Sequence, residues 1–467
     1  MPQDVLPARV SAVIGGVRGR HASARSGGLA HLLALIAGLS ALPMVAAVAR
    51  QGHCVAKGWN GDEQFWRGCF SDLPAQHQIA GLDRGLGGWI AGDLGLEQLP
   101  LLSGAMALVA ELVPDGGWLD SSRWYLALWA VIVAALVASG VVAIGLTRPD
   151  RLDLATQAAL SPVYVVAALL SADMLVVALV LWSMWAWSAR RAGLTGVLLG
   201  LAMLGHAWVW GVALALVGAA LARERRAELA RALGTALAVV AGAGAVLLAL
   251  TPSLVTAPVR AWWAMGSGYG SPWHVPALLG SALPAWSTTT LTALGALAAA
   301  ILGLALLRRP GRVPSWAQLA AVVVPVLAIT GKATPVQAAL WVVPLAILAG
   351  VSWRTHLLVV AVEAVHASAL WLYIGGLTDA DKGLPAQWYA VVILARVVAW
   401  GLLLWSLWAT PEETAVEGEG GVSGSSSTPR ISGAAAAPAT LDRLPASSTP
   451  VPAAGQRRIN PPVTERP

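Results

Sequence analysis

The sequence has 467 residues, of which 57% are apolar and only 12% are charged. This leaves too few polar side chains to coat a soluble protein of that size, so the composition excludes a water-soluble globular enzyme. The formal net charge of +6 does not indicate a nucleic-acid-binding face, because the arginines fall mostly in short segments between apolar runs.

The chain begins with a basic stretch, residues 1–28, followed by an apolar run at 29–49. A cytosolic basic flank followed by a first membrane span is the expected reading of this order. Ala47-Val48-Ala49 resembles a signal-peptide cleavage site, but the basic region and the apolar core are both longer than usual. We therefore expect a retained anchor, with a cleaved signal peptide as the alternative.

Residues 50 to about 98 form a polar stretch rich in Gly and Trp, and the whole connection at 50–123 is expected to be a large exoplasmic loop. Within it, residues 99–113 are apolar but begin at Pro100 and are too few for a full span. We predict that this segment lies in the membrane interface or dips into it. With that assignment, the arginine-rich connections further along the chain all fall on the cytosolic side.

Apolar runs separated by short charged segments predict an all-α polytopic membrane protein of about twelve transmembrane helices. The transmembrane domain covers residues 29–410. From Pro411 the chain is rich in Gly, Ser, Pro, Ala and Thr, which predicts a disordered cytosolic tail at 411–467. The predicted spans are 29–49, 124–146, 153–170, 173–188, 193–205, 208–222, 232–254, 286–307, 315–330, 336–350, 356–376 and 387–408.

The only two cysteines, Cys54 and Cys69, lie in the predicted exoplasmic loop. A disulfide there would close a loop of about 15 residues and constrain the unfolded chain by roughly 3 kcal/mol. Two free thiols are the alternative.

Two charged residues fall inside predicted spans, Glu363 in the eleventh and Arg396 in the twelfth. An unpaired charge in lipid is costly, and the two residues are expected at similar depths. We predict that they pair.

Several short motifs, in order along residues 25 to 410, resemble actinobacterial glycosyltransferase family 87 membrane proteins, which have the GT-C fold. Cys69 to Pro74 (CFSDLP) is similar to the family's CYSDIP, and Ser171 to Leu175 (SADML) is similar to NWDLL. The segment from Glu97 (EQLPLLSG) is similar to EYPVLTG, and the stretch from Gly196 to His206 is similar to GVLLGLGAATK. Gly331 to Leu345 (GKATPVQAALWVVPL) resembles NKVYSPQYxLWLLPL.

The resemblance implies a transferase that moves a sugar, most typically mannose, from a polyprenyl-phosphate carrier to a lipid-linked acceptor outside the plasma membrane. Such chemistry needs a carboxylate to accept the acceptor's hydroxyl proton and groups that hold the departing phosphate. Asp72 matches the acidic position of the first-loop motif and is the predicted base; a solvated loop carboxylate or a helix cap is the alternative. Asp173, Glu97 and Arg84 are assigned supporting roles, although Asp173 would also suit helix capping and Glu97 an interface anchor.

Three residues are candidates for binding the donor phosphate: Lys332, His206 and Gln337. Lys332 stands alone between apolar spans on the exoplasmic side, where a snorkelling lysine is the alternative. His206 occupies a position where the family has Lys, and a lone histidine among apolar residues is more often a packed side chain. Further departures are His77 and Ala338, each where the family has Tyr; together with His206 they leave open a weakened or noncatalytic protein.

No metal-ligand cluster, phosphate-cradling glycine loop or nucleotide signature occurs, so no metal or other cofactor is expected. The expected partners are the polyprenyl-phosphate sugar, a lipid-linked glycan acceptor and membrane lipids, and no nucleic acid. The expected location is the plasma membrane, with both termini cytosolic. The alternatives are a noncatalytic lipid-sugar-binding protein and a transporter or flippase, although the sequence shows no internal repeat of the kind common in transporters.

Overall fold

The computed structural model describes residues 26–311 and 313–409. Within these residues the regular elements are helices and no strand occurs, which confirms the predicted all-α class. The predicted tail at 411–467 lies outside the described residues, as does the predicted basic N-terminus apart from residues 26–28.

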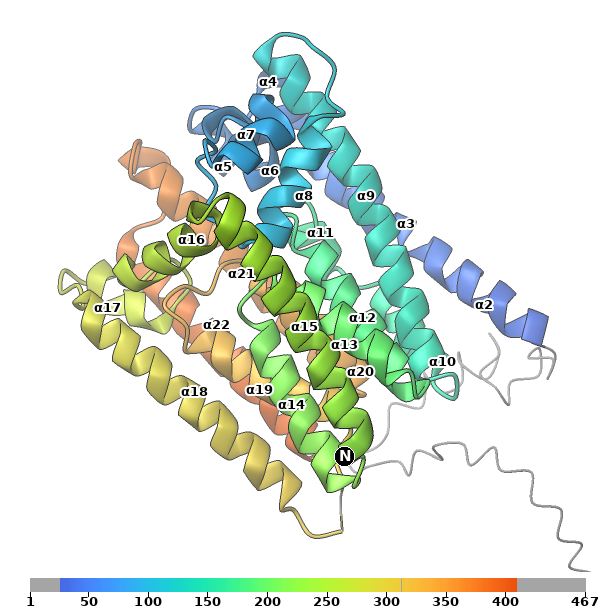
Figure 1. Ribbon diagram of the computed structural model, residues 1–467. Helices are drawn as coiled ribbons and strands as arrows, with labels where there is room; N and C mark the ends of the chain where they lie inside the picture. Colours follow the sequence, from blue (N-terminus) through green and yellow to red (C-terminus); the bar gives the residue numbers. More distant parts are fainter. Residues whose placement is uncertain (1–25, 312, 410–467) are drawn as a thin grey trace, which may run out of the picture. The chain divides into compact units, whose positions relative to one another are not determined.

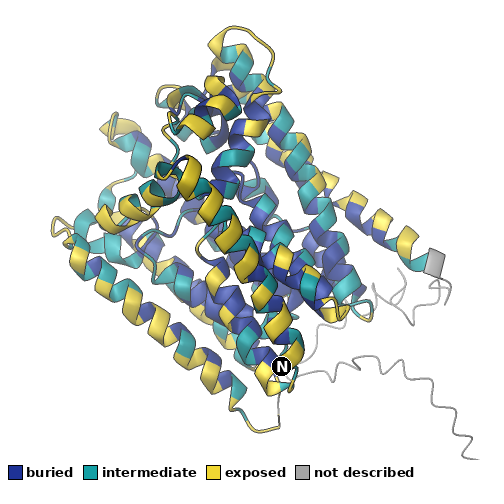
Figure 2. Cartoon of the chain, viewed as in Figure 1, coloured by how far each residue is buried: buried dark blue, intermediate teal, exposed yellow. Residues whose placement is uncertain are grey.

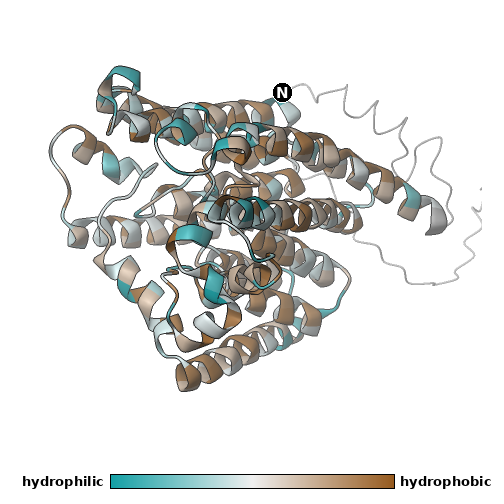
Figure 3. Ribbon diagram, turned by 90° about the horizontal axis from the view of Figure 1, so that it is seen from above, coloured by the Kyte–Doolittle hydropathy of each residue, from teal (hydrophilic) through white to brown (hydrophobic). Residues whose placement is uncertain are grey.

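Six apolar helices in the described part of the chain are long enough to cross a membrane (Figure 1). Their outward faces carry large exposed apolar side chains, such as Leu237 and Leu294, which are 68% and 56% exposed. Figure 3 shows most of the helical ribbon in brown, for hydrophobic residues, and lipid is the solvent that such surfaces match. The six are the continuous stretch of α2 (Ser26–Leu39) and α3 (Ala41–Arg50), α9 (Trp118–Thr147), α15 (Arg226–Leu250), α18 (Ala285–Leu307), α21 (Trp353–Gly376) and α22 (Ala386–Ala409).

The interior of the bundle is made of shorter apolar helices. All eleven residues of α20 are buried, and the centre of the bundle is correspondingly dark blue in Figure 2. At 1.5 Å per residue α20 is about 16 Å long, roughly half of the hydrocarbon layer. Six of the twelve predicted spans thus correspond to long helices, and the other six to short ones. The short interior helices are α12 (Met174–Ser188), α13 (Ala192–Met203), α14 (Val209–Ala222), α19 (Trp316–Ile329) and α20 (Ala338–Leu348).

The span predicted at 153–170 is not one continuous helix. It consists of α10 (Leu152–Ala159) and α11 (Val163–Ala167), which are separated at Leu160-Ser161-Pro162. Proline has no backbone N–H and disfavours helical geometry in the residue before it, so the helix ends here.

The predicted exoplasmic loop is folded into short helices. Figure 1 shows them together at one end of the bundle, and we call residues 52–91 the cap. Short helices are marginal on their own, so the cap depends on packing and on cross-links for its stability. It contains α4 (Gly52–Lys57), α5 (Glu63–Trp66), α6 (Asp72–Ile79), the 3-10 turn η1 (Leu82–Arg84) and α7 (Gly85–Ala91).

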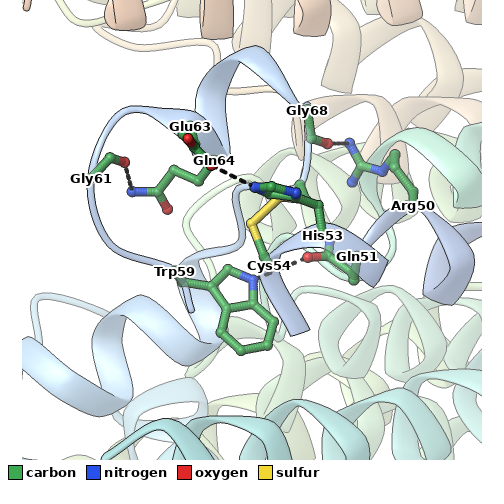
Figure 4. The surroundings of a disulfide bond; sticks show 10 residues. Arg50, Gln51, His53, Cys54, Trp59, Gly61, Glu63, Gln64 and Gly68 are labelled. Atoms are coloured by element: carbon green, nitrogen blue, oxygen red, sulfur yellow. Dashed lines mark hydrogen bonds and ion pairs between the residues drawn. A yellow bond between two sulfur atoms is a disulfide. The ribbon is translucent and has the colours of Figure 1, made fainter. Parts of the chain in front are cut away.

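A disulfide between Cys54 and Cys69 ties the start of the cap together, with both residues fully buried (Figure 4). The same region is held by Arg50, which donates a hydrogen bond to the Gly68 carbonyl at 3.0 Å. Trp59 donates through its indole nitrogen to the Gln51 side chain at 3.1 Å. The structure therefore forms the pairing expected from the sequence within the cap, and the bonds of Arg50 and Gln51 link the C-terminal end of α3 to it.

The segment predicted to be interfacial or re-entrant forms α8 (Pro100–Ala110), with proline in its first turn. Eleven residues rise only about 16 Å, too little to cross a membrane unaided. The helix packs into the bundle: the Leu101 N–H donates to the Leu204 carbonyl at 3.0 Å, and the Tyr125 hydroxyl donates to the Met106 carbonyl at 3.1 Å.

The topology can be tested at the two ends of α9. This 30-residue helix is about 45 Å long, so Asp120 near its start and Arg148 just after its end lie at opposite ends of the bundle. Because the two native cysteines are joined in the disulfide, Asp120→Cys and Arg148→Cys each introduce a single free thiol. An impermeant maleimide applied to intact cells should label Asp120→Cys and leave Arg148→Cys unlabelled. Equal labelling of both would contradict the twelve-span arrangement.

Candidate functional site

A cavity of about 140 Å³ lies where the cap meets the interior helices. Its volume is smaller than the roughly 300–1,000 Å³ of pockets that enclose drug-sized ligands, and suits one small polar molecule. It is lined by polar side chains from distant parts of the chain and by a few apolar ones. The lining residues are Asp72, Leu73, Gln98, Leu102, Met106, Ser171, Ala172, Asp173, His206, Pro335, Gln337 and Trp341.

Asp72 is the first residue of α6, and its backbone is fixed from both sides. The Ser71 hydroxyl caps α6 by accepting from the Leu73 N–H at 3.3 Å, and it donates to the Leu169 carbonyl at 2.6 Å. The Asp72 N–H donates to the Leu170 carbonyl at 2.9 Å. These bonds join the cap to the segment after α11 and hold the Asp72 side chain at the cavity.

Burial and the negative charge of Asp173 raise the pKa of Asp72 to about 6, although a hydrogen bond from Gln337 acts in the opposite direction. That bond runs from Gln337 Nε2 to Asp72 Oδ2 over 2.8 Å, between side chains 265 positions apart. Asp72 is therefore largely ionised at pH 7 but retains appreciable basicity, which suits a group that accepts a proton.

The second carboxylate, Asp173, occupies the N-cap position of α12 and is only 7% exposed. It makes no side-chain capping bond; instead, Trp341 of α20 donates from its indole nitrogen to Asp173 Oδ2 at 2.7 Å. The helix-cap alternative thus explains the position of Asp173 but not its hydrogen bond, which joins α12 to α20.

His206 lies in the connection between α13 and α14, with its ring centroid 4.3 Å from that of Trp341. Burial lowers the pKa of His206, so its imidazole is neutral at pH 7. Its Nδ1 atom is buried without a hydrogen-bond partner, and the same is true of Oε1 of Gln98. Buried polar atoms normally have partners, so these two are available to a bound polar molecule or to water.

The structure brings four of the predicted site residues together at the cavity: Asp72, Asp173, His206 and Gln337. Glu97 and Arg84 do not line it and are exposed. Sequence reasoning assigned no role to Gln98 or Trp341, although both lie inside the motifs that carry the family resemblance. His77 and Ala338 do not line the cavity either: His77 packs on Tyr125 with ring centroids 4.7 Å apart, and Ala338 is buried at the start of α20.

The phosphate-binding role predicted for Lys332 does not agree with its position. Lys332 does not line the cavity, is only 1% exposed and donates from Nζ to three backbone carbonyls, those of Trp262, Trp263 and Met265, at 2.9, 3.3 and 2.9 Å. These carbonyls belong to the C-terminal end of α16 (Ser253–Ala264), where helix carbonyls lack partners and a cation is favoured. Its ammonium also lies 4.4 Å from the centroid of the Trp262 ring. Lys332 thus anchors α16. This role differs both from the predicted phosphate binding and from the snorkelling alternative.

The predicted pair within the bundle is also present: Arg396 Nε lies 2.8 Å from Glu363 Oε1, and both side chains are buried. The Trp400 indole nitrogen donates to the same carboxylate oxygen at 2.6 Å. This ion pair is separate from the cavity.

Compared with protein-family models, with curated proteins and with solved structures, the chain matches none. The site therefore has to be interpreted from its own chemistry. Two carboxylates, two amides, a neutral imidazole and an indole are the groups that sugar-binding sites use for hydroxyls and ring faces. None of the described residues that line the cavity is a Lys or an Arg, so it is better suited to a neutral polyol than to a phosphate. Among the described residues, no group of three His, Cys, Asp or Glu is placed to hold a metal ion.

The connection at 331–337 lies against the loop 268–274, which includes η2 (Pro272–His274). The closest point is Gly270, where an added Cβ would lie 2.1 Å from the Thr334 carbonyl oxygen and 2.9 Å from an Arg396 nitrogen. Gly280 is the matched control, since it also has a positive φ but has open space around its Cβ position. Both alanine variants should therefore introduce backbone strain of a similar kind, and only Gly270→Ala should also displace the connection.

We expect Gly270→Ala to lower the thermal unfolding temperature in detergent by several degrees more than Gly280→Ala does. Comparison of the two purified variants with the unmodified protein tests this. Equal decreases in the unfolding temperature of the two variants would show that the close approach at Gly270 does not contribute to stability.

Proposed function

We propose that the protein is a GT-C-type membrane glycosyltransferase that moves a sugar, most typically mannose, from a polyprenyl-phosphate donor to a lipid-linked or cell-envelope glycan on the exoplasmic face. In this proposal the chain crosses the plasma membrane about twelve times, with both termini cytosolic, and the cap and cavity lie on the outer side. The observation that carries it is the pair of carboxylates, the half-buried Asp72 and the buried Asp173, in one cavity lined by amide, imidazole and indole groups.

Asp72 acts as the base in the proposed reaction. The acceptor hydroxyl oxygen attacks the anomeric carbon, and its proton passes to the Asp72 carboxylate. The bond between the anomeric carbon and the phosphate oxygen breaks, and polyprenyl phosphate leaves with the electron pair. A pKa of about 6 keeps Asp72 ionised at neutral pH while making it a better proton acceptor than an ordinary aspartate.

The departing phosphate would lie near the N-terminal end of α20, where the N-cap residue is the neutral Gln337. Helix N-termini favour anions through their free N–H groups and dipole. Asp173 and His206 would contact sugar hydroxyls, and the Trp341 indole fixes the orientation of Asp173.

A second candidate is a noncatalytic protein that binds the sugar of a lipid-linked donor. The absence of Lys and Arg from the cavity lining favours it, because a leaving phosphate is normally stabilised by cations. The two candidates share the sugar-binding cavity and differ in turnover.

One experiment separates them. Purified protein in nanodiscs is incubated with polyprenyl-phosphate [¹⁴C]mannose and a panel of membrane lipids extracted from the source cells. Formation of a labelled product that depends on acceptor supports the transferase. Saturable binding without product supports the noncatalytic protein, and the absence of both binding and product contradicts the two candidates together.

A further inference from the structure

Arg396 makes more contacts than the pairing with Glu363 requires. Its guanidinium donates from Nε to Glu363 and from its two terminal nitrogens to the carbonyls of Thr334 and Pro335, the latter at 3.1 Å. The planar fork of arginine thus joins α21 and α22 to the connection 331–337. Arg396, Glu363 and Thr334 are all completely buried, so each of these polar groups depends on its protein partners.

The connection 331–337 is held from a second side by the loop 268–274. The Gly268 N–H donates to the Lys332 carbonyl at 2.7 Å, and the Thr334 N–H donates to the Tyr269 carbonyl at 3.2 Å. The Ser271 hydroxyl donates to the Gly331 carbonyl at 2.7 Å. The backbone before α20 is thus fixed by several bonds, and that of Arg396 to Pro335 is the nearest of them to the cavity.

Gln337 follows Pro335 by two residues and is the N-cap of α20. Its side-chain amide reaches Asp72 across the cavity at 2.8 Å. A chain of direct contacts therefore runs from Arg396 through the Pro335 carbonyl and two backbone units to Gln337 and the carboxylate of Asp72.

A buried ion pair by itself is weak evidence for a contribution to stability, because apolar residues of similar volume often replace one without loss. Apolar residues could fill the space of Glu363 and Arg396, but they could not donate to the carbonyls of Thr334 and Pro335. The contacts of the guanidinium therefore point to a role beyond packing.

We propose that Arg396 is a positioning residue for the cavity, which fixes Gln337 against Asp72 by holding the carbonyls of Thr334 and Pro335. The consequence for sugar transfer rests on the proposed function, but the positioning itself does not. The titratable groups that face Asp72 across the cavity are Asp173 and His206; the residues that line it from α8 and from the start of α20 include none.

The test measures the protonation of Asp72 without any sugar. Dicyclohexylcarbodiimide reacts with protonated carboxyl groups, so its labelling of Asp72, quantified by mass spectrometry at a series of pH values, gives the midpoint of titration. Arg396→Lys keeps a positive charge beside Glu363, but its donors all leave one nitrogen on a shorter side chain, so it does not reproduce the planar fork that contacts Glu363 and both carbonyls at once. If Gln337 is released, Asp72 loses a hydrogen bond to its charged form, and the midpoint should move up by at least about half a pH unit.

Gln337→Ala should produce the same shift, and the double variant should shift no further, because both changes remove one contact. Arg123→Lys is the matched control: Arg123 also pairs with a carboxylate, Asp120, and donates to two carbonyls, those of Val55 and Ala56. It should leave the midpoint unchanged.

Should Arg396→Lys fail to fold, the double variant Glu363→Gln/Arg396→Met removes both charges together with the donors to the carbonyls, and it should show the same shift. The inference is wrong if the titration midpoint of Asp72 moves in Gln337→Ala but stays at the wild-type value in a folded Arg396 variant. It is also wrong if the midpoint in Arg396→Lys/Gln337→Ala moves further than in either single variant. Failure of the proposed function would appear instead as absence of transfer by the wild-type protein, with the labelling shifts intact.

Discussion

Replacing Asp72 by asparagine should lower sugar transfer at least about a hundredfold, because general-base catalysis by a positioned side chain contributes roughly 10²–10⁴-fold. Asparagine is nearly isosteric and can still accept the hydrogen bond that Gln337 donates to Asp72. The cavity, the disulfide and donor binding should therefore survive while proton acceptance is lost. The measurement is transfer from polyprenyl-phosphate mannose together with the affinity for the donor.

The same variant should be more stable than the wild type at neutral pH. The pKa of Asp72 is raised from 3.8 to about 6 in the folded protein, so between these values the folded state binds more protons than the unfolded state. The contribution of Asp72 to the free energy of unfolding is thus most favourable below about pH 4. It decreases as the pH rises to about 6 and does not recover at higher pH. Asp72→Asn removes the penalty, which is at most about 3 kcal/mol at pH 7. Transfer by the wild type should rise as the pH increases through about 6.

Asp62→Asn is the control, since Asp62 lies in the cap but does not line the cavity. It should change neither transfer nor stability appreciably. If Asp72→Asn kept normal transfer while Asp173→Asn lost it, the base would be Asp173. If neither mattered to a protein that binds the donor without turnover, the noncatalytic candidate would replace the transferase.

Breaking the buried pair should have the largest effect on stability. Arg396→Gln leaves the completely buried Glu363 without its cation and two backbone carbonyls with weakened partners. Removing one partner of a buried pair typically costs about 3–5 kcal/mol. The free energy of unfolding in detergent, obtained from denaturant titration, measures this loss.

An exposed ion pair supplies the comparison. Arg190 pairs with Glu228 at 3.0 Å, but its side chain is 62% exposed, so Arg190→Gln should cost no more than about 1 kcal/mol. Glu363→Gln/Arg396→Met, which leaves no uncompensated charge, should recover part of the stability that Arg396→Gln loses, because the two carbonyls still lack the donors of Arg396. Similar unfolding energies for Arg396→Gln and the wild type would contradict the pairing.

The lipid-facing helices could be predicted closely from the sequence. The runs at 286–307 and 387–408 correspond to Ala285–Leu307 and Ala386–Ala409, because long apolar segments bounded by polar residues allow few alternatives. The cap could not be predicted in this way. Its helices have four to eight residues and no long apolar run, and tertiary packing and the disulfide stabilise them.

The site was predictable only where a motif marked it. Asp72 and Gln337 were both singled out, but nothing in the sequence showed that residues 265 positions apart share a hydrogen bond. Lys332 was misread because the carbonyls that surround it belong to the end of α16, and their convergence depends on the tertiary fold. Gln98 was overlooked beside the charged Glu97, although the structure places the amide and not the carboxylate at the cavity.

The contacts of Arg396 also bear on the order in which the protein can mature. The segments from α19 to α21 are synthesised before α22, which carries Arg396. The carbonyls of Thr334 and Pro335 and the carboxylate of Glu363 therefore enter the membrane before the guanidinium that binds them. During that interval these groups must be hydrated or shielded, because lipid offers them no partner. Insertion of α22 is then the step that commits the preceding helices to their final packing, and nascent chains halted before residue 396 should remain attached to the insertion machinery.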